Sequence, residues 1–313
     1  MTILADVRSR TRGWHRPSAL AAAVLAVVAV LCVIAMLVDQ RTLAGAPVWA
    51  KPFKFAVSGA FYFAAWSWLV SLLPRFRRTA NGLTNLLVVI FFAEYGLLVF
   101  QAVRGHASHF NISTPQDAAI FGTMAAMIAV LWVATLVLTV LVMFTKVPDR
   151  ASAWAVRTGA ALSLVGITLG QLMTSPTAQQ LAQWRTGGRP DMVGGHTVGL
   201  ADGGPGLPIL GWSTVAGDLR IPHFVGMHAL QALPLLAFAL VALASRFPRL
   251  RDDAVRARLV LIGAAGYAGL IGLVTWQALR AQSIVHPDAM TLGAAAALVA
   301  AVSLGSWAAV RVR

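Results

Sequence analysis

Two histidines and a glutamine open an apolar stretch of the chain, in GDLRIPHFVGMHALQ at residues 217–231. On a helix, His228 and Gln231 are three residues apart and share one face. His223 lies five residues before His228, about 140° around the helix, and points elsewhere. An imidazole can ligate haem iron or a metal ion and can transfer protons near neutral pH. These residues form the first candidate site.

Glu94 is the single acidic residue inside the apolar segments, and Gln101, seven residues further on, shares its helical face. An ionisable residue at this depth in a membrane marks a candidate functional site. Two interpretations stay open. Glu94 can act as the base of a metal-activated hydrolase that acts on lipid headgroups. Alternatively, it pairs with Lys54 or Tyr62 and holds two helices together.

The remaining candidates lie near the ends of the apolar segments. His106 and His109 form an H-x-x-H pair in RGHASHFN, and His286 precedes a Pro-Asp pair at a helix start. Arg104 and Arg280 are suitable cations for haem propionates. The expected cofactor is haem b or a divalent metal. We predict metal ligands among His106, His109, His228 and His286, and cofactor contacts from His223, His228, Gln231, Arg104, Arg280, Gln101 and Gln277.

The composition is that of a membrane protein. Of the 313 residues, 58% are hydrophobic and 12% charged, and the mean hydropathy is +0.74. A soluble domain carries about 25% charged residues. The net charge of +14 does not indicate a nucleic-acid partner, because the basic residues lie in short segments between apolar stretches. Cys32 is the one cysteine, which excludes disulfides and thiolate metal clusters within one chain.

The apolar segments predict an all-α polytopic membrane helix bundle with eight transmembrane helices. Most are near the ~20 residues that cross a bilayer as helix. With the N-terminus inside, 17 of the 25 lysines and arginines fall in cytoplasmic segments, as expected for membrane proteins. We therefore expect cytoplasmic N- and C-termini and a location in the bacterial cytoplasmic (inner) membrane. The predicted spans are 20–38, 52–73, 83–103, 118–144, 158–174, 222–244, 259–279 and 291–310. Alternatively, the first segment is a signal peptide cleaved at AGA, residues 44–46.

Short matches in the same order predict a parallel 4+4 internal repeat. PRFRR (74–78) matches RFPRLR (246–251), FQAVR (100–104) matches WQALR (276–280), DAAIFG (117–122) matches DAMTLG (288–293), and KPFKF and IPHF open the second and sixth spans. The first half is residues 1–157, with the N-terminal tail, and the second is 158–313. The second half includes a long outer loop, 175–221, with ten glycines and two tryptophans. The glycines are compatible with disorder, whereas the mixture of Trp, Leu, Ile and Pro favours a folded lid on the outer surface.

Three functions are compatible with these features. The first is binding of haem or a divalent metal with a redox or hydrolytic role, in an outward-facing polar cavity that Glu94 shares with His228 and Gln231. Six of the seven histidines lie at or near the outer face, which favours this function. The second is transport or binding of a small solute, which parallel repeats and a buried acid suit. Against it, the inner halves of the spans carry no polar path, and no span is interrupted in its middle by Gly or Pro pairs. The third is an assembly role in which the outer loop binds another protein.

The eight-span plan, the outward histidines and the doubled four-helix units resemble the architecture of haem A synthase. That family has histidines inside the second and fourth helices of each half. Here the second, fourth and eighth spans contain none, so no catalytic residue is carried over. RGHASHFN and GDLRIPHFVGMHALQ resemble segments of uncharacterised bacterial multi-spanning membrane proteins, a resemblance limited to these stretches that implies no activity.

Overall fold

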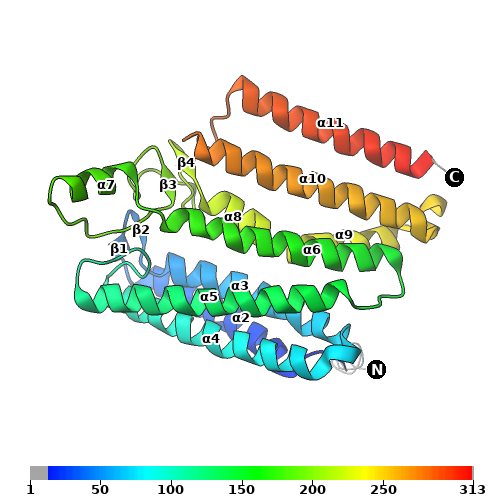
Figure 1. The fold of residues 1–313 in the computed structure, drawn as a ribbon, viewed down its shortest axis with the longest axis horizontal. Coiled ribbons are helices and arrows are strands. Elements are labelled where there is room, and N and C mark those ends of the chain that lie inside the picture. Colours follow the sequence, from blue (N-terminus) through cyan, green and yellow to red (C-terminus); the bar gives the residue numbers. More distant parts are fainter. Residues whose placement is uncertain (1–12, 312–313) are drawn as a thin grey trace. The chain divides into compact units, whose positions relative to one another are not determined.

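The fold is that of a computed structural model, described for residues 13–311 (Figure 1). Arg8, Arg10, Arg12 and Arg313, which contributed to the predicted topology, lie outside the described residues. Seven helices in the described range are long and apolar enough to cross a membrane, and a pair bent by 44° forms an eighth candidate. This confirms the predicted all-α polytopic bundle.

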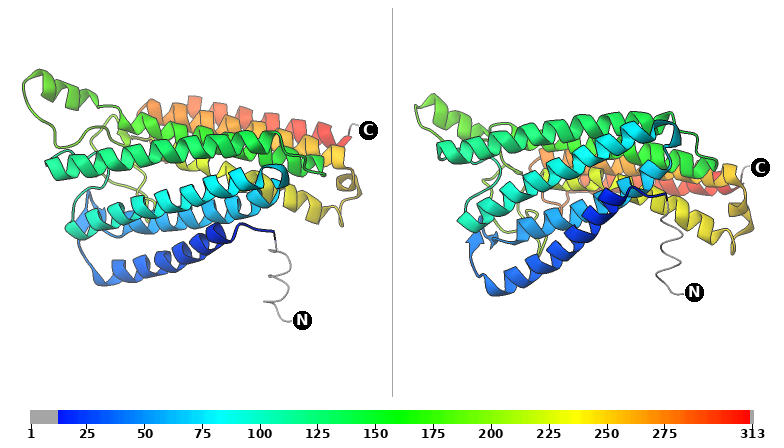
Figure 2. Two further views of the ribbon diagram at one scale, coloured as in Figure 1. Left: turned by 60° about the horizontal axis from the view of Figure 1, so that its bottom comes forward. Right: turned by 90° about the horizontal axis from the view of Figure 1, so that it is seen from below.

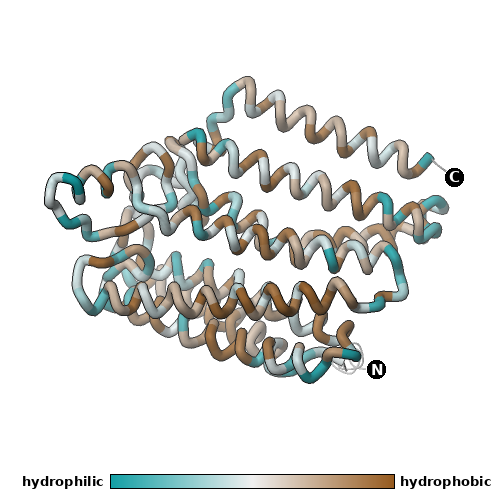
Figure 3. Tube along the Cα trace, viewed as in Figure 1, coloured by the Kyte–Doolittle hydropathy of each residue, from teal (hydrophilic) through white to brown (hydrophobic). Residues whose placement is uncertain are grey.

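The seven single helices are α2 (Arg16–Val38), α3 (Ala50–Ser71), α4 (Arg77–Arg104), α5 (Pro115–Met143), α6 (Arg150–Leu169), α10 (Asp253–Leu279) and α11 (Ala289–Arg311). The bent pair is α8 (Arg220–Met227) and α9 (Ala229–Leu243). Hydrophobic residues run along these helices, and hydrophilic residues gather at their ends and in the connections (Figure 3). The environment of the protein is therefore a lipid bilayer.

Short elements occupy the connections. They are the 3-10 turns η1 (Pro74–Phe76), η2 (Gly170–Thr174) and η3 (Pro248–Arg251), the helix α7 (Ala178–Arg185), and the strand pairs β1 (Thr42–Leu43) with β2 (Ala46–Pro47) and β3 (Thr197–Val198) with β4 (Gly217–Asp218). A capping box between Thr177 and Gln180 begins α7. Buried Asp218 accepts a hydrogen bond from the Ser213 backbone and pairs with Arg220 at 2.6 Å. The loop 175–221 is thus folded, as predicted, and its role as a lid stays a prediction.

The chain forms two compact units. Among the described residues, the first contains 13–41, 47–105 and 123–145, and the second contains 42–46, 106–122 and 146–311. In the second unit, α7 lies at the same end as β3 and β4 (Figures 1 and 2). The predicted boundary at 157/158 falls inside α6, because Asp149 caps that helix and its first turns carry Arg150 and Arg157. A division into two four-helix halves stays a prediction.

In the first unit, α2, α3 and α4 pack around large buried side chains. Phe63 and Trp66 of α3 are fully buried, and Phe63 meets Phe91 of α4 edge to face at 5.2 Å. Gly59 permits this approach, because a Cβ at that position would lie 2.4 Å from the Phe91 ring. The Tyr95 hydroxyl on α4 donates to the Pro52 carbonyl on α3 at 3.2 Å.

In the second unit, α10 packs against α6, α8, α9 and α11. Buried alanines of α6 meet leucines of α9 and valines of α10 in one apolar core. At one end of this core, Arg256 of α10 pairs with Asp149 at 3.0 Å. Asp253 of α10 accepts hydrogen bonds from the first backbone amides of α6. These contacts fix the start of α6 against the start of α10.

Two of the matched sequence motifs adopt the same local structure. Pro74 and Pro248 each begin a 3-10 turn that leads into a long helix, α4 or α10. Arg104 stacks over Phe100, and Arg280 stacks over Trp276, at the ends of the same two helices. The Asp motifs differ in register, since Asp117 lies within the first turn of α5 whereas Asp288 precedes α11. A repeat of the whole four-helix unit is not established by these similarities and stays a prediction.

Candidate functional site

The sixth predicted span is broken at His228. A continuous helix over 222–244 was expected, and the structure corrects this with a 44° bend between α8 and α9. At the bend the backbone amide of Gln231 donates to the His228 carbonyl, three residues earlier in the chain, at 3.1 Å. In a regular helix it would donate to the Met227 carbonyl. The bend therefore releases backbone carbonyls that need other donors.

Hydroxyl groups from two neighbouring helices satisfy carbonyls at the bend. Ser163 of α6 donates to the Met227 carbonyl at 2.9 Å. Tyr267 of α10 donates to the Val225 carbonyl at 2.6 Å. Because both hydroxyls come from outside the broken span, α6 and α10 hold the bend in place. The broken geometry is a property of the packed second unit.

Helices α6 and α8 touch through their backbones beside the bend. A Cβ at Gly166 would lie 2.2 Å from the Met227 nitrogen, and a Cβ at Gly226 would lie 2.4 Å from the Gly166 Cα. Real Cβ atoms do not approach backbone atoms this closely, so glycine is required on both helices. This contact brings Ser163 within reach of the Met227 carbonyl, and it presents the end of α6 to His223.

His223 is held in a defined tautomer by α6. Its Nδ1 lies 2.8 Å from the Gly166 carbonyl oxygen. Because a carbonyl only accepts, Nδ1 carries the proton and Nε2 has the lone pair. The Gly166 carbonyl can accept this bond because the Gly170 amide donates to the Ile167 carbonyl instead, at the point where α6 ends and η2 begins. A Cβ at Gly170 would lie 3.0 Å from the ring, so this glycine leaves room for the imidazole.

His228 and Gln231 touch, as their predicted shared face requires. His228 Nδ1 lies 3.3 Å from the Gln231 side-chain oxygen, and both side chains are half-buried. His228 is also close enough to His223 for a charge on one ring to act on the other. The broken span thus carries two imidazoles and a carboxamide, with His223 held against α6 and His228 held by Gln231.

His106 is oriented by a fully buried carboxylate. Its Nδ1 lies 3.1 Å from Asp117, while its own side chain is 39% exposed. Thr114 donates to the same carboxylate at 2.7 Å. The sequence STPQD (113–117) is typical of a helix start, and no sequence pattern indicated that Asp117 orients His106. A hydrogen bond from Nδ1 to a carboxylate is the usual support of a ligating histidine.

The other two histidines predicted as metal ligands have separate partners. His109 Nδ1 lies 3.0 Å from the Ser108 hydroxyl, and His286 Nδ1 lies 3.1 Å from the Thr214 carbonyl. Within residues 13–311, no three or more His, Cys, Asp or Glu side chains form a group that could hold a metal ion. The structure therefore gives no support to one divalent-metal site built from His106, His109, His228 and His286.

The residues at the helix ends are engaged in local contacts. The Arg280 guanidinium pairs with Asp288, and this hydrogen bond holds the pKa of the carboxyl well below its usual range. Such pairing weakens the case for Arg280 as a propionate partner. Gln277 is buried and donates to the Ser283 carbonyl at 2.9 Å, which is a structural role. Arg104 donates to the side-chain oxygen of buried Gln101.

Glu94 is buried on α4 of the first unit. Lys51 of α3 is close enough for its charge to act on the Glu94 carboxylate, a neighbour that sequence patterns did not suggest. The Tyr62 hydroxyl bonds to Thr135 at 2.8 Å. Glu94 belongs to the first unit and the two imidazoles of the bend belong to the second, so a cavity shared by them stays a prediction.

The helices and their composition define the class: a polytopic helical membrane protein with a bent span that carries two histidines. Compared with known protein families, curated proteins and solved structures, the chain matches none of them. The function must therefore be inferred from the site itself.

Proposed function

We propose that this protein is a multi-pass protein of the bacterial cytoplasmic membrane, with both termini inside, that binds haem through His223. The hydrogen bond from His223 Nδ1 to the Gly166 carbonyl carries the proposal. It fixes the ring and leaves the Nε2 lone pair as the ligand atom, as in histidines that bind metals. The chemistry that a bound haem would supply is one-electron transfer.

The donor set favours haem over a bare divalent metal. A protein metal site uses three or more side-chain ligands, and no such group occurs in the described part of the chain. Haem brings four nitrogens of its own and needs one or two protein ligands. His106 is the best second ligand, because Asp117 orients its ring through Nδ1 in the same way. His228 and Gln231 would then border the cofactor, and Glu94 stays a candidate base for a hydrolytic variant of this function.

The haem content of the purified protein tests this proposal. The full chain is produced in cells supplied with haem, purified in detergent, and assayed by the pyridine haemochrome method. We expect close to one haem per chain, with loss of most of it in His223→Ala. His196→Ala is the matched control, since His196 bonds within the outer loop to Asp202 and is not in the proposed ligand set. Equal haem content in both variants would contradict the role of His223.

A second candidate is transport or binding of a small solute, and the bend favours it. Broken helices often form solute sites in transporters, where the released carbonyls coordinate ions. Here, however, Ser163 and Tyr267 already occupy two of these carbonyls, which makes the bend a rigid support. Uptake of labelled solutes into vesicles that contain the protein tests this candidate. This candidate would be supported if a protein without haem takes up a solute and the His228→Ala substitution abolishes that uptake.

A further inference from the structure

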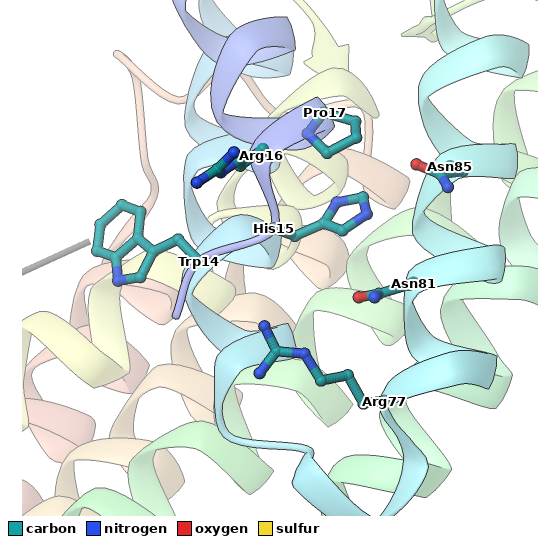
Figure 4. Close-up of a pocket in the computed structure, with 7 residues that line it drawn as sticks. All are labelled: Trp14, His15, Arg16, Pro17, Arg77, Asn81 and Asn85. Carbon is teal, nitrogen blue, oxygen red and sulfur yellow. The ribbon is translucent and has the colours of Figure 1, made fainter. Parts of the chain in front are cut away.

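A second polar feature lies in the first unit, far along the chain from the histidines of the bend. A cavity of about 450 Å³ opens where α2 and α4 begin (Figure 4). One side is Trp14 with the first residues of α2, and the other is Arg77, Asn81 and Asn85 of α4. Figure 4 shows the His15 ring and the two carboxamides turned toward the same space.

The cavity is strongly electropositive for its size. Arg16 and Arg77 contribute two guanidinium groups, and no acidic residue is among those that line it. Neither α2 nor α4 has an acidic residue in its first turn or a side chain that caps its start. The partial positive charges of both helix ends therefore add to the two guanidinium charges.

The walls of the cavity are preformed. The His15 amide donates to the Ser67 carbonyl at 3.0 Å, and the Ser67 hydroxyl donates back to the His15 carbonyl at 2.9 Å. Arg77 donates to the Gly13 carbonyl at 3.2 Å and joins the segment before α2 to the start of α4. The His15 ring is buried, and this burial, with the nearby Arg77 charge, holds the pKa of His15 below its ordinary value. The neutral His15 imidazole therefore forms part of the cavity wall, next to the Arg16 and Arg77 guanidinium groups.

Polarity falls along the helix faces that lead away from the cavity. Arg77, Asn81, Asn85 and Val89 are four residues apart, so they follow one another on one face of α4. Val89 is 66% exposed. On α2, Arg16 is followed in the same way by Leu20, which is also 66% exposed. A phospholipid has the same order: a charged phosphate, polar ester groups, then acyl chains.

We infer that this cavity binds the phosphate of an anionic phospholipid, with Arg77 and Asn81 as its donors and the acyl chains along Val89 and Leu20. Basic pockets at the ends of membrane helices are suited to anionic headgroups. Trp14 fits the headgroup level, where indole rings are enriched. The site is separate from the proposed haem ligand and does not depend on it.

Native mass spectrometry of the full chain in detergent tests this inference, with phosphatidylglycerol and phosphatidylcholine as the added lipids. We expect tighter binding of phosphatidylglycerol, weakened about tenfold by Arg77→Gln, which is the range for one charge-assisted hydrogen bond. Asn85→Ala, at an exposed position, should weaken it less. Arg78→Gln is the matched control, because Arg78 is the next residue, carries the same charge and does not line the cavity.

Competition with excess inorganic phosphate distinguishes recognition of the phosphate group alone from recognition of the whole lipid. If inorganic phosphate displaces phosphatidylglycerol from the wild-type protein, the cavity recognises the phosphate alone; if it does not, the cavity recognises the whole lipid. Both results support a phosphate site. Equal binding of the two lipids would overturn the inference, since it would show no selection for an anionic headgroup. An equal loss in Arg77→Gln and Arg78→Gln would also overturn it, since it would show attraction to surface charge only.

Discussion

Replacing Gly166 with alanine should destabilise the second unit, because the added methyl group has no room between α6 and α8. The added methyl group would lie 2.2 Å from the Met227 nitrogen and 2.3 Å from the Gly226 carbonyl carbon. Both are backbone atoms, so α6 and α8 must move apart. The Ser163 and His223 hydrogen bonds across this contact would then lengthen together.

The expected cost follows from two opposed effects. Overpacking of a tight contact costs about 3 kcal/mol at the upper end of its range. Alanine in place of glycine within a helix returns about 1 kcal/mol. The free energy of unfolding should therefore fall by about 2 kcal/mol. Gly272→Ala in α10 is the matched control, because a Cβ there meets no atom within 4 Å, and it should be neutral or stabilising.

Unfolding of both variants in mixed micelles, followed by circular dichroism as the denaturing detergent is increased, measures this difference. The substitutions are the same and both positions are helical, so propensity cancels and the packing effect remains. A Gly166→Ala protein as stable as Gly272→Ala would refute the close contact of α6 with α8. It would also remove the physical basis for the position of His223.

Three further predictions concern the supports of the site. Ser163→Ala and Tyr267→Phe should each lower the free energy of unfolding by about 1 kcal/mol, because each leaves a backbone carbonyl at the bend without its hydrogen-bond donor. Thr158→Ala is the control in the same unfolding assay. It removes only an exposed hydrogen bond within α6 and should lower the free energy of unfolding less. Asp117→Ala should cost about 1 kcal/mol or more, since it removes a buried acceptor of Thr114 and His106; Asp191→Ala in the loop 175–221 serves as the control. The pKa of Asp288 is lower in the folded chain than its usual value because of Arg280, so the carboxylate adds stability above about pH 4 and loses it as the pH falls further. As the pH falls below about 4, wild type should therefore lose more of its free energy of unfolding than Arg280→Gln, so the difference between the two proteins at neutral pH narrows; a larger acid-dependent loss in the variant would contradict the assigned direction.

The eight spans were predictable because a bilayer imposes length and hydropathy on each helix separately. The positions of α2, α5 and α11 follow from their own residues, with no information about neighbours. The same local logic identified His228 and Gln231 as neighbours three residues apart, and the structure confirms their contact.

The bend was not predictable from the broken span alone. Pro234, the proline inside α9, lies six residues beyond His228 and does not mark the break. The break depends on Ser163 and Gly166 of α6 and on Tyr267 of α10, which are distant in sequence. A signal was present: a serine and a glycine three residues apart on one face of an apolar span. Such a pair marks where another helix comes close, but it does not say which one.

The orienting partners of the histidines were missed for a similar reason. The Asp117 carboxylate accepts a hydrogen bond from the Thr114 hydroxyl at the start of α5, as expected for an acidic residue in a first turn, but it also reaches back to His106. The Gly166 carbonyl is invisible to any pattern of side chains. Backbone partners of this kind set the tautomer of a histidine. Sequence patterns therefore indicated histidine as the ligand, but they could not show which ring nitrogen is free to bind.

An absorption spectrum of the detergent-purified protein, oxidised and then reduced with dithionite, tests the central claim most directly. We predict a Soret band, with α and β bands that sharpen on reduction if His106 would supply a second protein ligand to the haem. In His223→Ala these bands should be lost or greatly weakened, while His196→Ala keeps them. A featureless spectrum from cells supplied with haem would contradict haem binding and leave solute transport as the leading function.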